Sequence, residues 1–99
     1  MDIACIRELF QQGHFNIYFH AFEEALKDGI TGDDMLYGVE HGEIIEEYPE
    51  RSRCLLLATT ATKVPIHIVI DYSCTDELQI VTTYIPDQRE WIAFRKRRR

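Results

Sequence analysis

The hydrophobic pattern of this chain changes its period once, and that change constrains the fold more than any other feature. Up to Gly42, apolar residues recur every three or four positions, which is typical of amphipathic helices. From Glu43 onward they alternate with polar residues or run continuously, as they do in strands. Helices followed by closely spaced strands predict an α+β fold with an antiparallel sheet.

Three helices are expected before this change. The first is capped by Asp2 and stopped by Gly13, and the second runs from about Tyr18 to Asp28. The third begins at a capping-box pattern, Thr31 to Asp34, and ends at His41-Gly42.

Four strands are expected after the change of period at Glu43, and short connections join them as an antiparallel meander. They are Glu43–Tyr48, Cys54–Ala58, Pro65–Tyr72 and Leu78–Ile85, with a turn at Ser73-Cys74-Thr75-Asp76. One alignment of the last hairpin places Ile68 opposite Thr82 and His67 opposite Thr83, and a slip by one residue stays open. A second capping-box pattern, Asp87 to Glu90, predicts a short C-terminal helix carrying Trp91 and Phe94.

Length and charge predict one domain with a basic tail. The 99 residues suffice for a single core, so residues 1–99 are interpreted as one domain, with an N-terminal helix at 1–13 and a core at 17–94. The net charge of −6 divides into −11 for residues 1–94 and +5 for the tail, 95–99. The negative charge of residues 1–94 disfavours non-specific binding of nucleic acid. The tail could hold phosphates, or could engage acidic side chains of this protein or of a partner.

Several classes of function are not indicated. No apolar run approaches the ~18 residues of a membrane span, and the N-terminus is not a signal peptide, so a cytoplasmic protein is expected. Three cysteines without a C-x-x-C pair predict reduced thiols. The four histidines fit no zinc or iron spacing, and no nucleotide-binding or hydrolase signature occurs, so we expect no metal and no cofactor.

Two histidines are candidates for proton transfer. His20 lies in the first turn of the second helix, where its ring can point away from the apolar stripe. His67 faces away from Ile66 and Ile68, toward what is expected to be the open side of the sheet. A neutral imidazole with a pKa near ~6.5 suits general acid or base chemistry. A structural role for each histidine is the alternative.

Several segments, taken in order, resemble the bacterial and archaeal family catalogued as domain of unknown function 4258. The resemblance covers about Ile17 to Arg97. Its segments are His20-Ala21, Gly29-Ile30-Thr31 with Asp33-Asp34, the run from His41 to Pro49, Pro65 to Val69, Thr82 to Asp87, and Trp91 with the arginines beyond it. Family members commonly carry arginines along the second helix, where this chain has Phe22, Glu23 and Glu24 and retains only Lys27.

The resemblance implies a fold akin to the RelE, barnase and colicin ribonuclease-like toxins, with an antitoxin-like partner. Such enzymes cleave RNA without metal, so His20 and His67 become the candidate catalytic acid and base. The candidate RNA contacts are Lys63, Thr83, Tyr84, Arg95 and Arg97. The competing hypothesis is a non-catalytic interaction module that uses the sheet face or an exposed edge strand.

Overall fold

The computed structural model describes residues 1–74 and 76–98. Thr75, in the predicted turn, and Arg99, at the end of the predicted basic tail, lie outside the described residues. The helices are α1 (Ile3–Gln11), α2 (Phe19–Lys27) and α3 (Gly32–His41), with a 3-10 turn, η1 (Pro49–Arg51). The strands are β1 (Phe15–Ile17), β2 (Glu43–Tyr48), β3 (Arg53–Thr59), β4 (Pro65–Asp71), β5 (Leu78–Tyr84), β6 (Trp91–Ile92) and β7 (Lys96–Arg97). The α+β class is confirmed.

Helices α1 and α3 begin where the sequence predicts, because their caps form. The Asp2 carboxylate accepts a hydrogen bond from the backbone N–H of Cys5, at 2.9 Å. At α3 both bonds of the capping box are present: Thr31 Oγ1 accepts from the N–H of Asp34, and the Asp34 carboxylate accepts from the N–H of Thr31. Gly13 follows α1 with φ +78°, the left-handed conformation that favours glycine.

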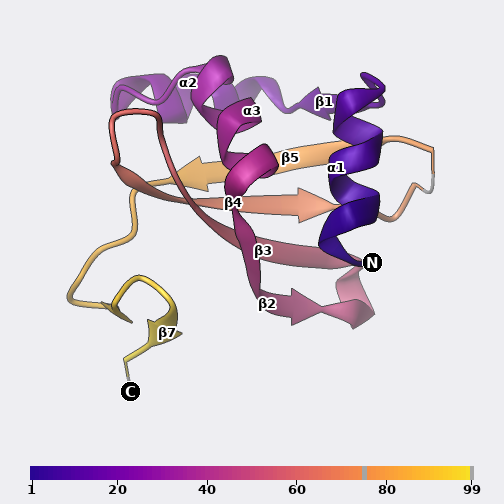
Figure 1. Ribbon diagram of the computed structural model, residues 1–99. Helices are drawn as coiled ribbons and strands as arrows, with labels where there is room; N and C mark the ends of the chain where they lie inside the picture. Colours follow the sequence, from indigo (N-terminus) through magenta and orange to yellow (C-terminus); the bar gives the residue numbers. More distant parts are fainter. Residues whose placement is uncertain (75, 99) are drawn as a thin grey trace.

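The prediction of a four-stranded antiparallel sheet is wrong in strand number and in direction. The sheet has five strands in the order β1-β5-β4-β3-β2, and β1 pairs parallel with β5 (Figure 1). Phe15–Ile17 is too short for its alternation to stand out between a helix stop and the next helix. It is held by its pairing with Leu78–Ile80, which the sequence pattern does not reveal.

The register of β4 and β5 departs from the expected alignment at a bulge. Near the turn, Ile70 pairs with Ile80, as that alignment requires. Between Val69 and Ile70 the register then shifts, so His67 lies opposite Tyr84 rather than Thr83. The one-residue slip that the sequence left open is therefore present in the half of the hairpin that carries His67.

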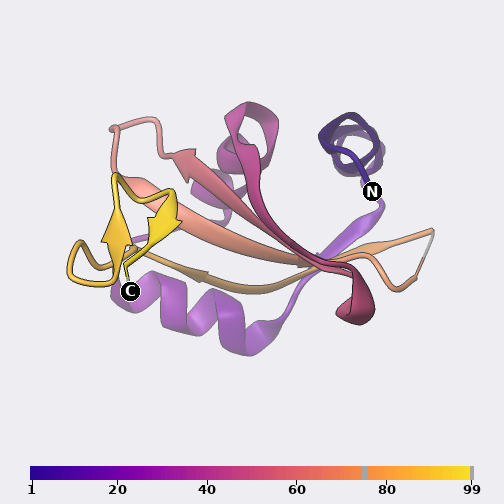
Figure 2. The same ribbon diagram turned by 90° about the horizontal axis from the view of Figure 1, so that it is seen from below.

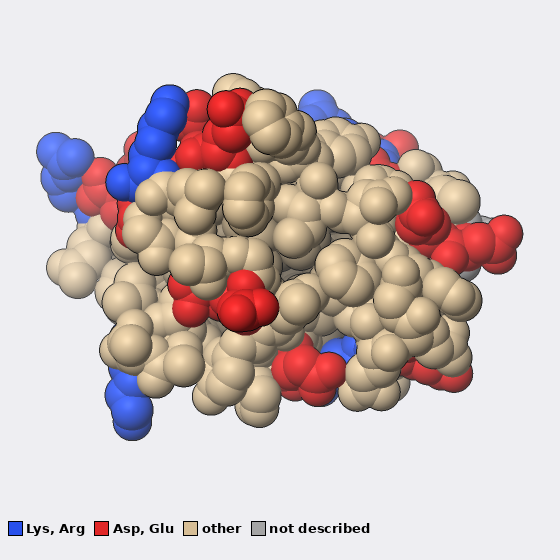
Figure 3. Space-filling view, turned by 90° about the horizontal axis from the view of Figure 1, so that it is seen from above, with Lys and Arg blue, Asp and Glu red and all other residues tan. Residues whose placement is uncertain are grey.

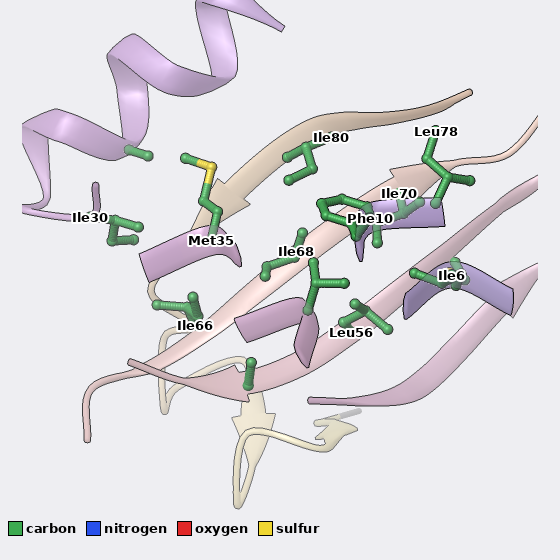
Figure 4. Packing of buried hydrophobic residues seen from close by; sticks show 14 residues of the cluster. Ile6, Phe10, Ile30, Met35, Leu56, Ile66, Ile68, Ile70, Leu78 and Ile80 are labelled. Carbon is green, nitrogen blue, oxygen red and sulfur yellow. The ribbon is translucent and has the colours of Figure 1, made fainter. Parts of the chain in front are cut away.

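The core lies between the sheet and the helices α1 and α3. Figure 4 shows isoleucines of β4 and β5 meeting side chains from both helices. α2 instead packs beside β5, at the edge of the sheet (Figures 1 and 2). The largest core side chains, all buried, include Ile6, Phe10, Ile30, Met35, Leu56, Ile66, Ile68, Ile70, Leu78 and Ile80.

The predicted C-terminal helix is wrong, because this segment forms a two-stranded hairpin, β6–β7. The Asp87 carboxylate accepts from the backbone N–H of Arg89, two residues on, and also binds the Arg89 guanidinium, at 2.8 Å for each contact. This arrangement closes a local turn instead of capping a helix. Ala93 and Phe94 then take positive φ angles of 51° and 63°, and the chain reverses.

Candidate functional site

The C-terminal hairpin, residues 91–97, covers part of the sheet face that points away from α1 and α3. In Figure 2 it crosses in front of the sheet at the end where β3 finishes and β4 begins. Alternation along β4 directs His67, Val69 and Asp71 to this face, while Ile66, Ile68 and Ile70 enter the core. Polar side chains of β4 and β2 contact the hairpin, since His67 lies against Phe94 and Glu46 against Arg97.

His67 is the centre of these contacts and is fully buried. Its Nε2 lies 2.6 Å from the carbonyl oxygen of Phe94, and its Nδ1 lies 3.1 Å from the hydroxyl of Tyr84. Since a carbonyl can only accept, Nε2–H is the donor and Nδ1 accepts from the Tyr84 hydroxyl. Trp91 packs edge-on against the ring, with centroids 4.4 Å apart. Burial lowers the pKa of His67, so the ring is neutral and fixes the hairpin to the sheet.

A β-bulge in β2 brings Glu46 to the same face. The pairing of β2 with β3 shifts between Ile44 and Glu46, so Glu46 lies opposite Leu55 instead of joining Ile44 on the core side. Tyr48, two residues on, shares the face and donates its hydroxyl to the Glu46 carboxylate. The bulge thus converts a position that plain alternation would bury in the core into one that can carry a charge.

Arg97 completes the group from β7. Its Nε lies 3.1 Å from Oε2 of Glu46, and its terminal nitrogen lies 3.1 Å from Oε1. The guanidinium also lies over the ring of Trp91, 4.5 Å from the centroid. A fork-shaped contact with a carboxylate and a stack on an aromatic ring fix the orientation of the guanidinium. We call Glu46, Tyr48 and Arg97 the polar cluster.

Protonation in the polar cluster follows from these contacts. Burial, and then the Glu46 carboxylate, raise the pKa of the Tyr48 phenol, so it keeps its proton at neutral pH. Its hydrogen bonds to Tyr48 and Glu46 raise the pKa of Arg97, which is always charged. The Glu46 side chain is 23% exposed, so its carboxylate is fixed in place and still reachable from solvent.

Two hollows flank the C-terminal hairpin. One, of about 510 Å³, we call the arginine groove; the polar cluster contributes Tyr48 and Arg97 to its wall, and Arg51 and Arg53 line it as well. The other, of about 490 Å³, we call the lysine pocket; Lys63 and Arg95 line it, with Glu43 paired to Arg95. The basic side chains around the hairpin are thus divided between two hollows, with two in the lysine pocket and three in the arginine groove.

The residues singled out from the sequence are distributed as follows. Lys63 and Arg95 lie together in the lysine pocket, whereas Arg97 belongs to the arginine groove. Tyr84 contacts His67, but Thr83 lies opposite Ile68, buried on the helix-covered side. His20 is exposed on α2, and no hydrogen bond among the described residues joins it to His67.

Sequence reasoning missed Glu46, Tyr48, Arg51 and Arg53. Glu46 and Tyr48 lie in the run from His41 to Pro49, which is one of the segments that carry the family resemblance. That resemblance is the sequence signal that could have indicated them. Their shared face depends on the bulge, and simple period-two alternation does not predict a bulge. Among residues 1–74 and 76–98, no three His, Cys, Asp or Glu side chains gather as a metal site. The described helices are too short and too polar to cross a membrane.

Helices α1 and α3 on one side of the sheet, and an ordered polar cluster on the other, define a small α+β domain whose second sheet face carries polar groups in fixed orientations. Residues 17–85 match the family described as Domain of unknown function (DUF4258), and the chain belongs to that family. The match includes His20, Glu46, Tyr48 and His67 and ends before the C-terminal hairpin. Comparison with curated proteins and with solved structures gives no match.

Proposed function

We propose that this protein is a toxin-like, metal-independent ribonuclease of the RelE and barnase-like class, acting at the polar cluster. One observation carries the proposal: a carboxylate, a phenol and a guanidinium meet at the rim of a groove lined by further arginines. RNA cleavage without metal needs a base for the 2′-hydroxyl, a cation for the phosphorane and an acid for the leaving oxygen. Glu46, Arg97 and Tyr48 supply these groups in that order.

The proposed reaction is a transesterification. The Glu46 carboxylate takes the proton of the 2′-hydroxyl, and the 2′-oxygen forms a bond to phosphorus. Arg97 turns from Glu46 to the phosphate and neutralises the charge that develops on it. The bond between phosphorus and the 5′-oxygen breaks, and the 5′-oxygen receives a proton from Tyr48. The products are a 2′,3′-cyclic phosphate and a 5′-hydroxyl.

Local charge supports RNA as the substrate although the body of the chain is acidic. Three arginines and one glutamate line the groove, and Arg51 makes no ion pair among the described residues. Arg53 is paired with Asp71 at 2.9 Å, which orients its guanidinium along the groove wall. In this proposal His67 is a positioning residue, because both of its ring nitrogens are engaged.

Cleavage of a fluorescent RNA in the presence of chelator tests the chemistry. Glu46→Gln is expected to lower the rate about 10²- to 10⁴-fold, since it removes the base and keeps the shape. Glu47→Gln is the matched control, because Glu47 neighbours Glu46 on β2 but is exposed, and its rate should be unchanged. The all-deoxy substrate should resist cleavage, since it lacks the 2′-hydroxyl.

The histidine pair implied by the family resemblance is tested in the same assay. If His20→Ala and His67→Gln abolish cleavage while Glu46→Gln does not, proton transfer belongs to the histidines. Urea unfolding of each variant separates lost chemistry from lost folding. Growth arrest on expression, absent for Glu46→Gln and relieved by a neighbouring gene product, would support the toxin assignment and its antitoxin-like partner.

The second candidate function is a non-catalytic interaction module. It is favoured by the pairing of Arg95 with Glu43 and of Arg97 with Glu46, which neutralises part of the basic tail against β2. In this view the polar cluster only fastens the C-terminal hairpin. Absence of cleavage by the folded wild-type protein would favour this function.

A further inference from the structure

Arg53 is held by a set of hydrogen bonds that has no part in the proposed reaction. Its Nε donates to Oδ2 of Asp71, at 2.9 Å. Asp71 is buried, and its Oδ1 accepts from the backbone N–H and the hydroxyl of Ser73, at 2.9 and 2.6 Å. Burial raises the pKa of Asp71, but the hydrogen bonds from Ser73 and Arg53 outweigh it, so the pKa is lowered and the carboxylate stays charged. A fixed anion therefore orients the Arg53 guanidinium through one of its nitrogens.

The terminal nitrogens of Arg53 are left for a ligand. Among residues 1–74 and 76–98, the Arg53 side chain makes its hydrogen bond through Nε alone. Both terminal nitrogens of a guanidinium carry further N–H donors. The Arg53 side chain is 35% exposed, so solvent reaches these donors. A guanidinium that is fixed at Nε and open at its fork matches two oxygens of a phosphate group.

Arg51 brings a second guanidinium to the same hollow. Ser52, between the two arginines, has a left-handed φ of 53°, and its carbonyl accepts from the N–H of Tyr72 at 2.8 Å. The turn that carries Arg51 is thus fixed to the end of β4, and both arginines line the arginine groove. Glu50 lines the groove as well, but Arg51 makes no ion pair among the described residues.

Strand pairing places Arg53 beside the polar cluster. Its partner on β2 is Tyr48, and its partner on β4 is Asp71. Directly opposed residues point to the same face of a sheet, with Cα atoms about 5 Å apart. Arg53 therefore lies one strand away from the proton donor of the proposed reaction.

The helix-bearing side of the molecule has a different distribution of charge. Figure 3 views the molecule from the side where α2 and α3 lie, and shows acidic groups scattered over a largely uncharged surface, with most basic groups at the rim. That surface would not attract a chain of phosphates. The arginine groove, on the hairpin-covered face, carries three arginines and one glutamate.

We propose that Arg53 and Arg51 form a phosphate subsite, which binds the RNA phosphate next to the one that is cleaved. The proposal rests on the proposed function, because the polar cluster gives the position of the cleaved phosphate. Since Asp71 already fixes the Arg53 guanidinium, a phosphate binds it without the cost of ordering a free side chain. Val69 and Val81 also line the groove and offer an apolar surface to the base between the two phosphates.

Binding of a fluorescent single-stranded deoxythymidine oligomer to the full-length protein, measured at several salt concentrations, tests the subsite without cleavage. Each phosphate contact contributes about 0.7 to the slope of log affinity against log salt. Arg53→Gln and Arg51→Gln should each reduce the slope by about that amount. Arg89→Gln is the matched control, because Arg89 is also paired with an aspartate but does not line the groove, and its slope should equal that of wild type.

Two variants separate charge, orientation and folding. Arg53→Lys keeps the charge, so its slope should stay near that of wild type, while its affinity falls about threefold because an ammonium cannot form the fork. Arg51→Gln keeps the test valid if Arg53→Gln folds poorly, since Arg51 is exposed.

The subsite and the proposed reaction fail in different ways. Slopes equal to wild type in both Arg53→Gln and Arg51→Gln, or the same reduction in Arg89→Gln, would overturn the subsite even if the protein cleaves RNA. Displacement of the oligomer by polyglutamate would also overturn it, since the groove would then recognise the carboxylates of an acidic partner. Reduced slopes without cleavage by wild type would remove the reaction and leave a site for nucleic-acid phosphate. Where RNA is cleaved, Arg53→Gln should raise KM about threefold and leave kcat unchanged, because the contact is equal in the ground and transition states.

Discussion

The two faces of the sheet are built differently, and β4 shows the difference within one strand. Ile66, Ile68 and Ile70 point to the helices and are fully buried among other apolar side chains. His67, between two of them, is equally buried on the other face, but through hydrogen bonds to Tyr84 and to the carbonyl of Phe94. One face is closed by packing and the other by directed polar contacts.

The two faces therefore contribute different properties: the helix-covered face mainly stabilises the fold, and the other face holds polar groups in the orientations that chemistry needs. Apolar burial is non-directional and scales with area, so many side chains share the task on the helix-covered face. A buried polar group is tolerated only when its partners are in place, so the other face fixes a few groups in defined orientations. An oriented carboxylate beside a guanidinium, as in the polar cluster, is what proton transfer requires.

The largest effect is expected on the helix-covered face. Ile68→Ala should lower the free energy of unfolding by about 2–5 kcal/mol, because it leaves a cavity in the middle of the core. Val69→Ala, the next residue and on the other face, should cost about 1 kcal/mol or less. Urea unfolding followed by circular dichroism measures both. Equal losses would contradict the division into two faces.

A smaller effect is expected where the C-terminal hairpin meets the sheet. Trp91→Ala should cost about 1–3 kcal/mol, because Trp91 is buried but its hairpin can detach without opening the core. The arginines after Trp91 should then become sites for rapid cleavage by trypsin, as detected by mass spectrometry. Trp91→Phe, which keeps a ring against His67, should stay resistant. Cooperative loss of the whole fold in Trp91→Ala would show that the hairpin belongs to the core.

The sequence predicts the helix-covered face well and the hairpin-covered face poorly. Caps at Asp2 and Thr31 and the period-two alternation of β4 are local signals, and each was confirmed. The C-terminal segment has a helix-like spacing of Trp91 and Phe94, but its conformation is decided by distant groups. His67 and Glu46 hold it extended, and contacts across 27 and 51 residues are not visible in a local pattern.

The candidate site was predictable only in part, for the same reason. His67 and Arg97 were singled out from the sequence, and both lie on the hairpin-covered face. Glu46 was missed because the sheet face to which its side chain points depends on the bulge in β2. A second bulge, in the β4–β5 pairing, placed Thr83 on the helix-covered side. A bulge shifts every later residue to the other face, so an error of one residue reassigns a site.

Thr83 is a buried polar residue on the helix-covered face, and its substitution is expected to increase stability. Its hydroxyl is buried and has no hydrogen-bond partner among the described residues. Thr83→Val, similar in shape, should therefore raise the free energy of unfolding by about 1 kcal/mol. Thr82→Val, on the groove side, should change it by about 0.5 kcal/mol or less. A loss of stability in Thr83→Val would mean that the hydroxyl has a partner.

The smallest expected effect is a dependence of stability on pH that comes from the hairpin-covered face. Burial lowers the pKa of His67 below its ordinary value of 6.5 in the folded protein. Between the folded and unfolded pKa values the unfolded chain binds a proton that the folded chain does not, so stability falls as pH drops below about 6.5. Above that value neither state is protonated at His67 and this contribution is flat.

Urea unfolding between pH 7.5 and pH 5 isolates this histidine, since the carboxylates with lowered pKa values, such as Asp71, lose their contribution only at more acidic pH. His67→Gln should flatten the profile, because an amide can still donate to the Phe94 carbonyl but does not titrate in this range. If His67→Gln keeps the wild-type slope, the acid sensitivity arises elsewhere, and burial of a neutral His67 does not distinguish the two faces in solution.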